Sequence, residues 1–296
     1  MIKKTLVWLL SATAVISLTA CSAQQTKNSD SSAQQTTTER KDNGNSASQT
    51  NTKKGDSETV YQVALLQSLT QGYYDGIIKV SELKEHGDTG IGTFEGVNGE
   101  MIVLDGEVYQ ALGDGTVQVA DDNETIPFSN VTFFEPDITE TLSDVKGMAN
   151  LKENLDQVTT KNGKNMFYVV KINGTFDNMF VRSEIKQEKP YKTLDKALET
   201  DQREFTYENT SGTIVGLFCP NYMGGLNTPG WHFHFISDDK TKGGHILDLS
   251  FSNAQAELDQ TPKFEMCLTD NEAFQDMELA KDVSKEIQKV EANEES

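Results

Sequence analysis

The chain has 296 residues and a net charge of −20, from 46 acidic and 26 basic side chains. Such an acidic body repels phosphate backbones and anionic lipid, which excludes a nucleic-acid-binding protein and a protein held on a membrane by charge. Three cysteines and 22 glycines exclude disulfide-rich and collagen-like scaffolds.

The first twenty residues predict a secretory signal. Two lysines precede an apolar run over residues 6–16, which is too short to span a bilayer comfortably. The run leads into Leu18-Thr19-Ala20-Cys21, which resembles the bacterial lipobox, where the cysteine is lipidated. An ordinary signal peptide with an incidental cysteine is the alternative. We predict a signal peptide over residues 1–20 and a lipid on Cys21, which anchors an extracytoplasmic protein to the cell membrane.

A polar segment follows the predicted lipidation site. Residues 22–57 contain no Val, Ile, Leu, Met, Phe, Trp or Tyr. Such a segment cannot bury enough apolar surface to offset its ordering entropy. We therefore predict a disordered tether over residues 21–57 and one folded domain over residues 58–296.

The domain begins with a predicted helix over residues 60–69, followed by a hairpin. Two apolar runs, residues 101–104 and 108–112, flank Asp105-Gly106, which is a strong hairpin signal. Apolar residues at helical spacing predict a second helix over 145–158, with Ser143 as its N-cap.

Strand-like runs dominate the second half of the domain, at residues 166–172, 179–185, 213–218, 231–237 and 246–251. A last helix is predicted from a capping box of Thr269 and Glu272 and an apolar stripe over 274–290. This order predicts an α+β fold. The body is strand-rich, with two β-sheet subdomains, flanking helices and a metal site on strands of the C-terminal half.

Three of the four histidines lie close together in the sequence. His232 and His234 alternate with aromatic residues on a predicted strand, so they share one face. A polar loop then returns the chain to Gly243-Gly244-His245 on a neighbouring strand. Three converging imidazoles form the ligand set of a catalytic metal with open positions, and zinc is the metal this set favours. Core histidines satisfied by hydrogen bonds are the alternative.

Several segments together resemble the bacterial α-acetolactate decarboxylase family over residues 60–296. These segments are Gly90–Phe94, Asn98–Gly106, Arg182, Gln187–Tyr191, Gly230–Phe235 and Gly243–His245. One departure is Ser183-Glu184-Ile185, where the resemblance implies a Thr-Val-Pro-like run.

The resemblance implies conversion of (S)-2-acetolactate to (R)-acetoin and CO₂ by a homodimer. It implies a metal on His232, His234 and His245, and no organic cofactor, because the metal would stabilise the charge left by CO₂. It also implies that Arg182 binds the substrate and stabilises charge, that Glu100 and Glu291 ligate the metal or relay a proton, and that Thr93 lies at the substrate pocket.

Two other functions remain open at the level of sequence. An exported protein with clustered histidines is also compatible with a metal- or solute-binding lipoprotein. The two closely spaced histidines of His232-Phe233-His234 occur in cupin-like oxygenases too, but the spacing to His245 fits that class poorly. We expect Cys219 and Cys267 to be buried free thiols without a role at the metal.

Overall fold

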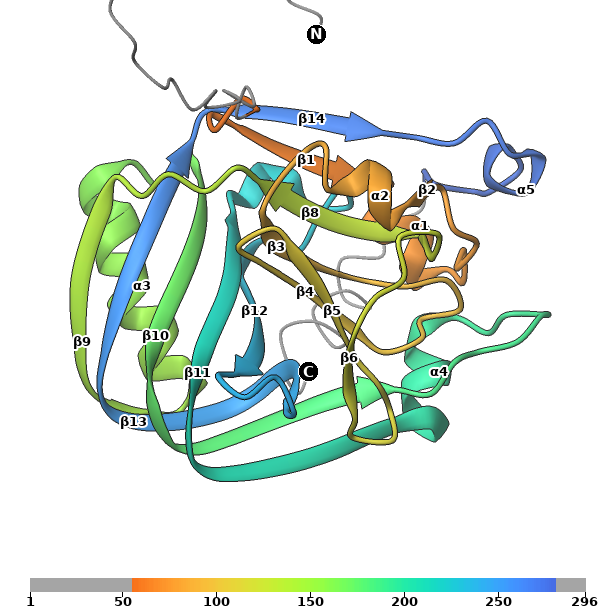
Figure 1. The fold of residues 1–296 in the computed structure, drawn as a ribbon. Coiled ribbons are helices and arrows are strands. Elements are labelled where there is room, and N and C mark those ends of the chain that lie inside the picture. Colours follow the sequence, from red (N-terminus) through yellow and green to blue (C-terminus); the bar gives the residue numbers. More distant parts are fainter. Residues whose placement is uncertain (1–54, 281–296) are drawn as a thin grey trace, which may run out of the picture. The chain divides into compact units, whose positions relative to one another are not determined.

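The computed structural model describes residues 55–280. It confirms a strand-rich α+β fold with two main sheets and few helices (Figure 1). Residues 1–54 and 281–296 lie outside the description, and so do the predicted signal peptide, Cys21, most of the tether and Glu291.

The first sheet has seven strands in the order β14-β1-β8-β3-β4-β5-β6. Its strands are β1 (Thr59–Val63), β3 (Thr89–Thr93), β4 (Glu100–Leu104), β5 (Glu107–Ala111), β6 (Val117–Val119), β8 (Phe128–Thr132) and β14 (Lys263–Cys267). The pairing of β1 with β14 is parallel and joins the two ends of the domain, as Figure 1 shows.

The second sheet has five strands, and three of them are very long. Its strands are β9 (Ile138–Lys146), β10 (Phe167–Glu184), β11 (Gln202–Cys219), β12 (Gly230–Ser237) and β13 (Gly243–Thr261). Both β10 and β12 pair with β11 and with β13, so the pairings of these four strands form a closed ring. The strands β2 (Ile78–Lys79) and β7 (Thr125–Ile126) pair with each other and form a third, separate sheet.

The helices are short except for α3. They are α1 (Leu66–Thr70), α2 (Val80–Leu83), α3 (Met148–Asn162), α4 (Leu194–Asp201) and α5 (Glu272–Gln275), with a 3₁₀ turn at Asn221–Met223. No helix within residues 55–280 is long and apolar enough to cross a membrane.

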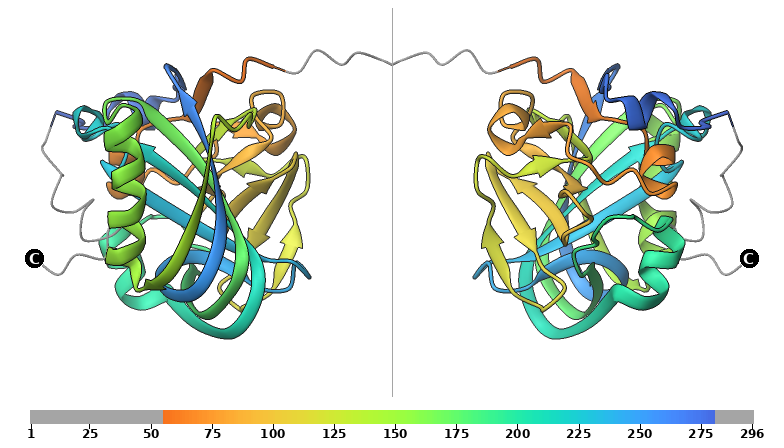
Figure 2. Two further views of the ribbon diagram at one scale, coloured as in Figure 1. Left: turned by 90° about the vertical axis from the view of Figure 1, so that its left-hand side faces the viewer. Right: turned by 90° about the vertical axis from the view of Figure 1, so that its right-hand side faces the viewer.

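The part of the five-stranded sheet around β12 is buried on both faces. Helix α3 lies along one face, as Figure 2 shows. Leu151 and Leu155 of this helix belong to the same apolar cluster as Phe233 of β12. The opposite face packs on the seven-stranded sheet, where Val215 belongs to the same apolar cluster as Ile102. Any polar side chain between the two sheets is therefore removed from bulk water.

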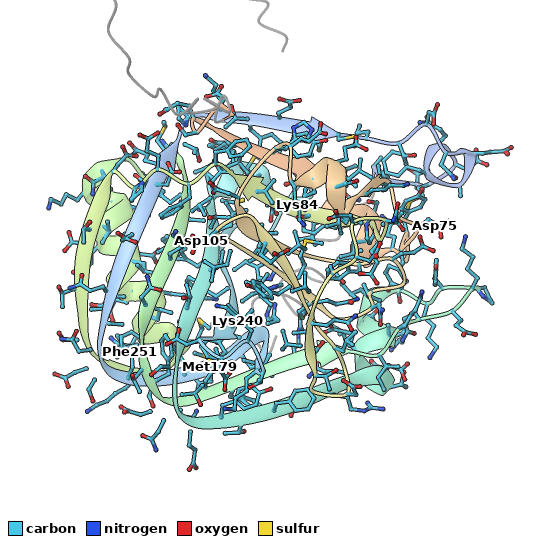
Figure 3. All side chains as sticks on the ribbon, viewed as in Figure 1. Asp75, Lys84, Asp105, Met179, Lys240 and Phe251 are labelled. Carbon is cyan, nitrogen blue, oxygen red and sulfur yellow. The ribbon has the colours of Figure 1, made fainter. Side chains whose placement is uncertain are left out.

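The predicted hairpin at Asp105-Gly106 is confirmed. Both residues have positive φ, 53° and 84°, as a two-residue turn between β4 and β5 requires. The carboxylate of Asp105, which is labelled in Figure 3, accepts a hydrogen bond from Lys171 on β10. The Nζ–Oδ1 distance is 3.0 Å. The turn of one sheet is thus tied to a strand of the other.

The first predicted helix is confirmed only at its end. Residues 59–63 form β1, and the helix α1 starts only at Leu66. Val60 through Val63 are all buried, because β1 has β14 and β8 on its two sides and apolar clusters on both faces. A strand buried on both faces loses its alternating pattern, so its apolar run resembles a helix.

The other two predicted helices are confirmed only in part. Helix α3 begins after Gly147, and Ser143 belongs to β9; the Met148 amide donates instead to Asp248 of β13, at 2.8 Å. Helix α5 ends at Gln275, and its N-cap is Asn271 rather than Thr269. Residues 276–280 are not helical, and the rest of the predicted stripe lies outside the described residues.

The remaining sequence expectations concern isolated side chains. Cys219 and Cys267 are both free thiols, and Cys219 is buried as expected, whereas Cys267 is partly exposed. His86, the fourth histidine, stacks on Tyr61 with ring centroids 3.7 Å apart, far along the chain from the other three.

Asp259 on β13 makes stability depend on pH. Its side chain is 3% exposed and accepts a hydrogen bond from the Glu135 amide. Burial raises the pKa of Asp259 from 3.8 to about 7. The hydrogen bond from the Glu135 amide opposes this rise, whereas the charges of Asp137, Glu58 and Glu135 reinforce it. Between pH 3.8 and about 7 the folded protein keeps the proton of Asp259, whereas the unfolded chain releases it. The free energy of unfolding therefore falls as the pH rises through this range.

We predict that Asp259→Asn stabilises the protein at pH 8 by up to about 4 kcal/mol and changes little at pH 4. The amide oxygen can still accept the Glu135 hydrogen bond. Urea unfolding at both pH values measures the effect, and Asp270→Asn, at an exposed carboxylate, is the control. Equal stabilisation at both pH values would contradict the assignment.

Candidate active site

The register of three neighbouring strands places functional side chains in one row. His234 on β12 is directly opposite His245 on β13, and His245 is directly opposite Arg182 on β10. Register partners point to the same face of a sheet, and His232 shares that face because it lies two residues from His234. Next to the row, Gly244 has φ 147°, and a Cβ there would lie 2.5 Å from the Arg182 carbonyl oxygen. Only glycine permits this approach.

Arg182 reaches the histidine face because β10 changes its alternation. Up to Phe176, the even-numbered residues of β10 face α3. Beyond Phe176, odd-numbered residues face α3 instead, namely Met179 and Val181. The pairing with β11 is interrupted at this point, where Asn209 has a positive φ of 47°. The register with β13 shifts a few residues later, between Phe180 and Val181. The side chains of Arg182 and Glu184 therefore turn toward the seven-stranded sheet.

That sheet presents a second row opposite the first. Thr93 on β3 and Glu100 on β4 are register partners. Together the two rows line a pocket between the two sheets. The pocket is lined by Leu69, Gly92, Thr93, Val97, Glu100, Phe128, Arg182, Glu184, Leu194, Leu198, His232 and His234.

The three histidines converge on one point. The Nε2 atom of His232 lies 2.9 Å from His245 Nδ1 and 3.1 Å from His234 Nε2. All three residues are at most 8% exposed, and their ligand atoms lie within 4.8 Å of one another. His234 is oriented from its other side, since Nδ1 lies 2.8 Å from the Met101 carbonyl oxygen. A carbonyl only accepts, so Nδ1 carries the proton and the Nε2 lone pair faces the cluster.

The environment keeps these imidazoles neutral. Burial, with the positive charge of Arg182 second, lowers the pKa of His232 to about 3. Burial also holds the pKa values of His234 and His245 well below their usual range, and the neighbouring charged groups act in the same direction. Neutral imidazole is the ligand form, so three converging lone-pair nitrogens can hold a divalent metal ion.

Three charged side chains lie together beside the histidines. Arg182 Nε is 3.9 Å from Glu100 Oε1 and 3.5 Å from Glu184 Oε1, and Glu100 Oε2 is 3.5 Å from His234 Nε2. All three charged residues are at most 7% exposed. The structure thus brings Arg182 and Glu100 together. Glu184 is a further buried acid of this group that was not among the predicted site residues, although its spacing of two from Arg182 on a strand indicates the same face.

Thr93 also lines the pocket, and its hydroxyl donates to the Gly99 carbonyl oxygen at 2.8 Å. Its hydrogen is therefore occupied, and its oxygen remains able to accept from a ligand. The other side of the pocket is apolar, with Leu69 from α1 and Leu194 and Leu198 from α4. The site therefore offers a polar wall with metal ligands facing a small apolar wall.

Such a site, with three histidines that could hold a metal ion and with buried acid and guanidinium groups lining the same pocket, is typical of a metal-assisted enzyme. A family model of alpha-acetolactate decarboxylase matches residues 60–281. The alpha-acetolactate decarboxylase of Methanosarcina mazei is 42% identical over 235 residues, which are 79% of this chain and 81% of that protein. The Bacillus subtilis enzyme is 33% identical over 237 residues, 80% of this chain and 92% of that protein.

Solved structures agree. The crystal structure of alpha-acetolactate decarboxylase from Bacillus subtilis strain 168 matches with a TM-score of 0.75 and 33% identity, over 79% of this chain and 99% of that chain. The chain belongs to the alpha-acetolactate decarboxylase family, and it is an enzyme. This membership favours the decarboxylase over the binding-protein and cupin-like alternatives.

We predict that His245→Ala lowers the bound metal at least tenfold, because one of three ligands is lost. His86→Ala is the matched control, since His86 stacks on Tyr61 outside the cluster and should leave metal content unchanged. Elemental analysis after dialysis against a weak chelator measures both. Full metal content in His245→Ala would place the metal elsewhere.

Proposed function

We propose that this enzyme converts (S)-2-acetolactate to (R)-acetoin and CO₂ with the help of a divalent metal ion, zinc in particular. The observation that carries the proposal is the row of Arg182, His245 and His234 on one sheet. Arg182 and His234 of this row line one pocket together with Thr93 and Glu100 of the other sheet. The family membership of the chain supports the choice of substrate.

The residues that would hold the metal are His232, His234 and His245. Imidazole ligands with a carboxylate nearby suit Zn²⁺. A cation there supplies Lewis-acid stabilisation of the negative charge that appears at the ketone oxygen when CO₂ leaves.

Arg182 is proposed to bind the substrate carboxylate. Its guanidinium is 5% exposed, so its attraction for an anion is little screened by water. A planar guanidinium can grip both carboxylate oxygens at once and so fix the bond that breaks relative to the neighbouring ketone.

Glu100 is proposed to handle the proton. The bond to CO₂ breaks with its electron pair moving toward the ketone, and a proton then takes the place of CO₂ at the hydroxyl-bearing carbon. Glu100 is the pocket acid 3.5 Å from His234, on the sheet opposite Arg182, so delivery from its side would fix one product configuration. Thr93 would accept a hydrogen bond from the substrate hydroxyl. The predicted role of Glu291 as a second acid is kept as part of this proposal.

The direct test incubates the purified protein with racemic acetolactate and follows acetoin by chiral chromatography. We expect (R)-acetoin from the metal-loaded protein, loss of activity after chelation, and recovery with Zn²⁺. Full activity in protein shown to be metal-free would contradict the metal-assisted reaction. An absence of acetoin with every divalent metal would contradict the substrate.

Arg182→Lys tests the guanidinium. Lysine keeps the charge but offers a point charge without the planar fork, so we expect kcat/KM to fall roughly 10²-fold with metal content unchanged. Arg203→Lys, at the exposed start of β11, is the control and should be as active as the parent. Near-parental activity of Arg182→Lys would remove Arg182 from the substrate site.

We also propose an extracytoplasmic homodimer, with each subunit anchored by a lipid on Cys21. The lipobox-like Leu18-Thr19-Ala20-Cys21 and the polar stretch after it support the anchor. We predict that Cys21→Ser abolishes labelling by a radioactive fatty acid and moves the protein from the membrane to the soluble fraction. Labelling that persists in Cys21→Ser would contradict the anchor, and light scattering of the soluble variant measures the oligomer.

A further inference from the structure

Glu184 is a buried acid in the pocket that the proposed reaction does not use. It is the last residue of β10, it lines the pocket with Arg182, and it is 5% exposed. Its Oε1 atom lies 3.5 Å from Arg182 Nε, closer than the 3.9 Å between that nitrogen and Glu100. Burying a carboxylate is costly unless charge and hydrogen bonds compensate, so its position calls for a reason.

The backbone around Glu184 is fixed on both sides. The Ser183 hydroxyl donates to the Ala111 carbonyl oxygen at 2.6 Å, which ties the end of β10 to β5 of the other sheet. The Ile185 amide donates to the Asp201 carbonyl oxygen at 3.0 Å, which ties it to the end of α4. The carboxylate of Glu184 therefore has a rigid base from which to hold a neighbouring group.

Arg182 stands between two acids that come from different sheets. Glu184 precedes the α4 connection on the same strand as the arginine, whereas Glu100 comes from β4 across the pocket. A long arginine side chain has several rotatable bonds, and gripping a small carboxylate requires the guanidinium plane to be held in one orientation. Glu100 alone would leave that orientation to a residue that also has to handle a proton.

The charge balance of the pocket also indicates a role for Glu184. Among its lining residues are one guanidinium and two carboxylates, and the imidazoles are neutral. With a divalent cation and a monoanionic substrate added, the charges of these described lining residues, the cation and the substrate sum to zero. Without Glu184 the same set would carry one uncompensated positive charge in a region of low polarity, which is costly.

We propose that Glu184 is a positioning residue for Arg182: it orients the guanidinium toward the substrate carboxylate and balances its charge. This inference rests on the proposed function. Glu184 acts through Arg182, so its contribution depends on the guanidinium being present.

A double-mutant cycle tests the proposal in the metal-loaded full chain. Glu184→Gln keeps the shape of the side chain and removes its charge, and it is made both in the parent and in Arg182→Lys. The control is Glu204→Gln, an exposed acid on β11 directly opposite Arg182 in the register but outside the pocket. Acetoin formation, metal content and the binding of lactate are measured for every variant. Lactate is a 2-hydroxy acid without the ketone that decarboxylation requires.

We expect Glu184→Gln to lower kcat/KM roughly tenfold in the parent and less than about threefold in Arg182→Lys. Metal content should be unchanged, and Glu204→Gln should match the parent. The same factor in both backgrounds would show that Glu184 acts independently of Arg182 and would overturn the proposal. Parental activity of Glu184→Gln, or loss of its metal or secondary structure, would overturn it as well.

The lactate measurement separates this inference from the proposed function. If the parent forms no acetoin, the proposed function fails, yet the cycle can still be read from lactate affinity. A loss of lactate affinity in Glu184→Gln that disappears in Arg182→Lys would support the positioning role alone. Equal loss in both backgrounds would refute it.

Discussion

The hydrogen-bonded register across β10, β13 and β12 is the constraint on which the site depends. It fixes Arg182, His245 and His234 as direct neighbours, so the proposed metal ligands and the proposed substrate-binding cation share one surface. A shift of one residue in any of these strands would turn one of these side chains to the α3 side of the sheet. The change of alternation within β10 and the glycine at position 244 both support this register.

The second requirement is exclusion of water. The pocket lies between two sheets that share an apolar cluster, which includes Ile102 and Val215, and α1 and α4 add leucines on its far side. Burial keeps the imidazoles neutral and ready to bind a metal, and it strengthens the attraction between Arg182 and an anion. The same burial makes each uncompensated charge costly, which explains why the single guanidinium is accompanied by two carboxylates.

Local patterns in the sequence predicted much of this structure, and the remainder depends on contacts between distant segments. The Asp105-Gly106 turn and the alternation around His232 and His234 are local features, and the structure contains both. The strand β1 was mistaken for a helix because its burial comes from β14, about 200 residues away. The hydrogen-bond acceptor for the first amide of α3 is Asp248, which is distant in the sequence and has no local signal. The face on which Arg182 and Glu184 lie depends on the change of alternation within β10, which has no local signal either.

The central claim is that one pocket holds both the metal and the substrate carboxylate. A crystal structure of the protein with Zn²⁺ and lactate tests it most directly. The account predicts zinc bound by the nitrogens of His232, His234 and His245 at about 2.0–2.1 Å, with the lactate carboxylate on Arg182. Zinc bound at another site, or lactate bound away from Arg182 while zinc occupies the histidines, would contradict it.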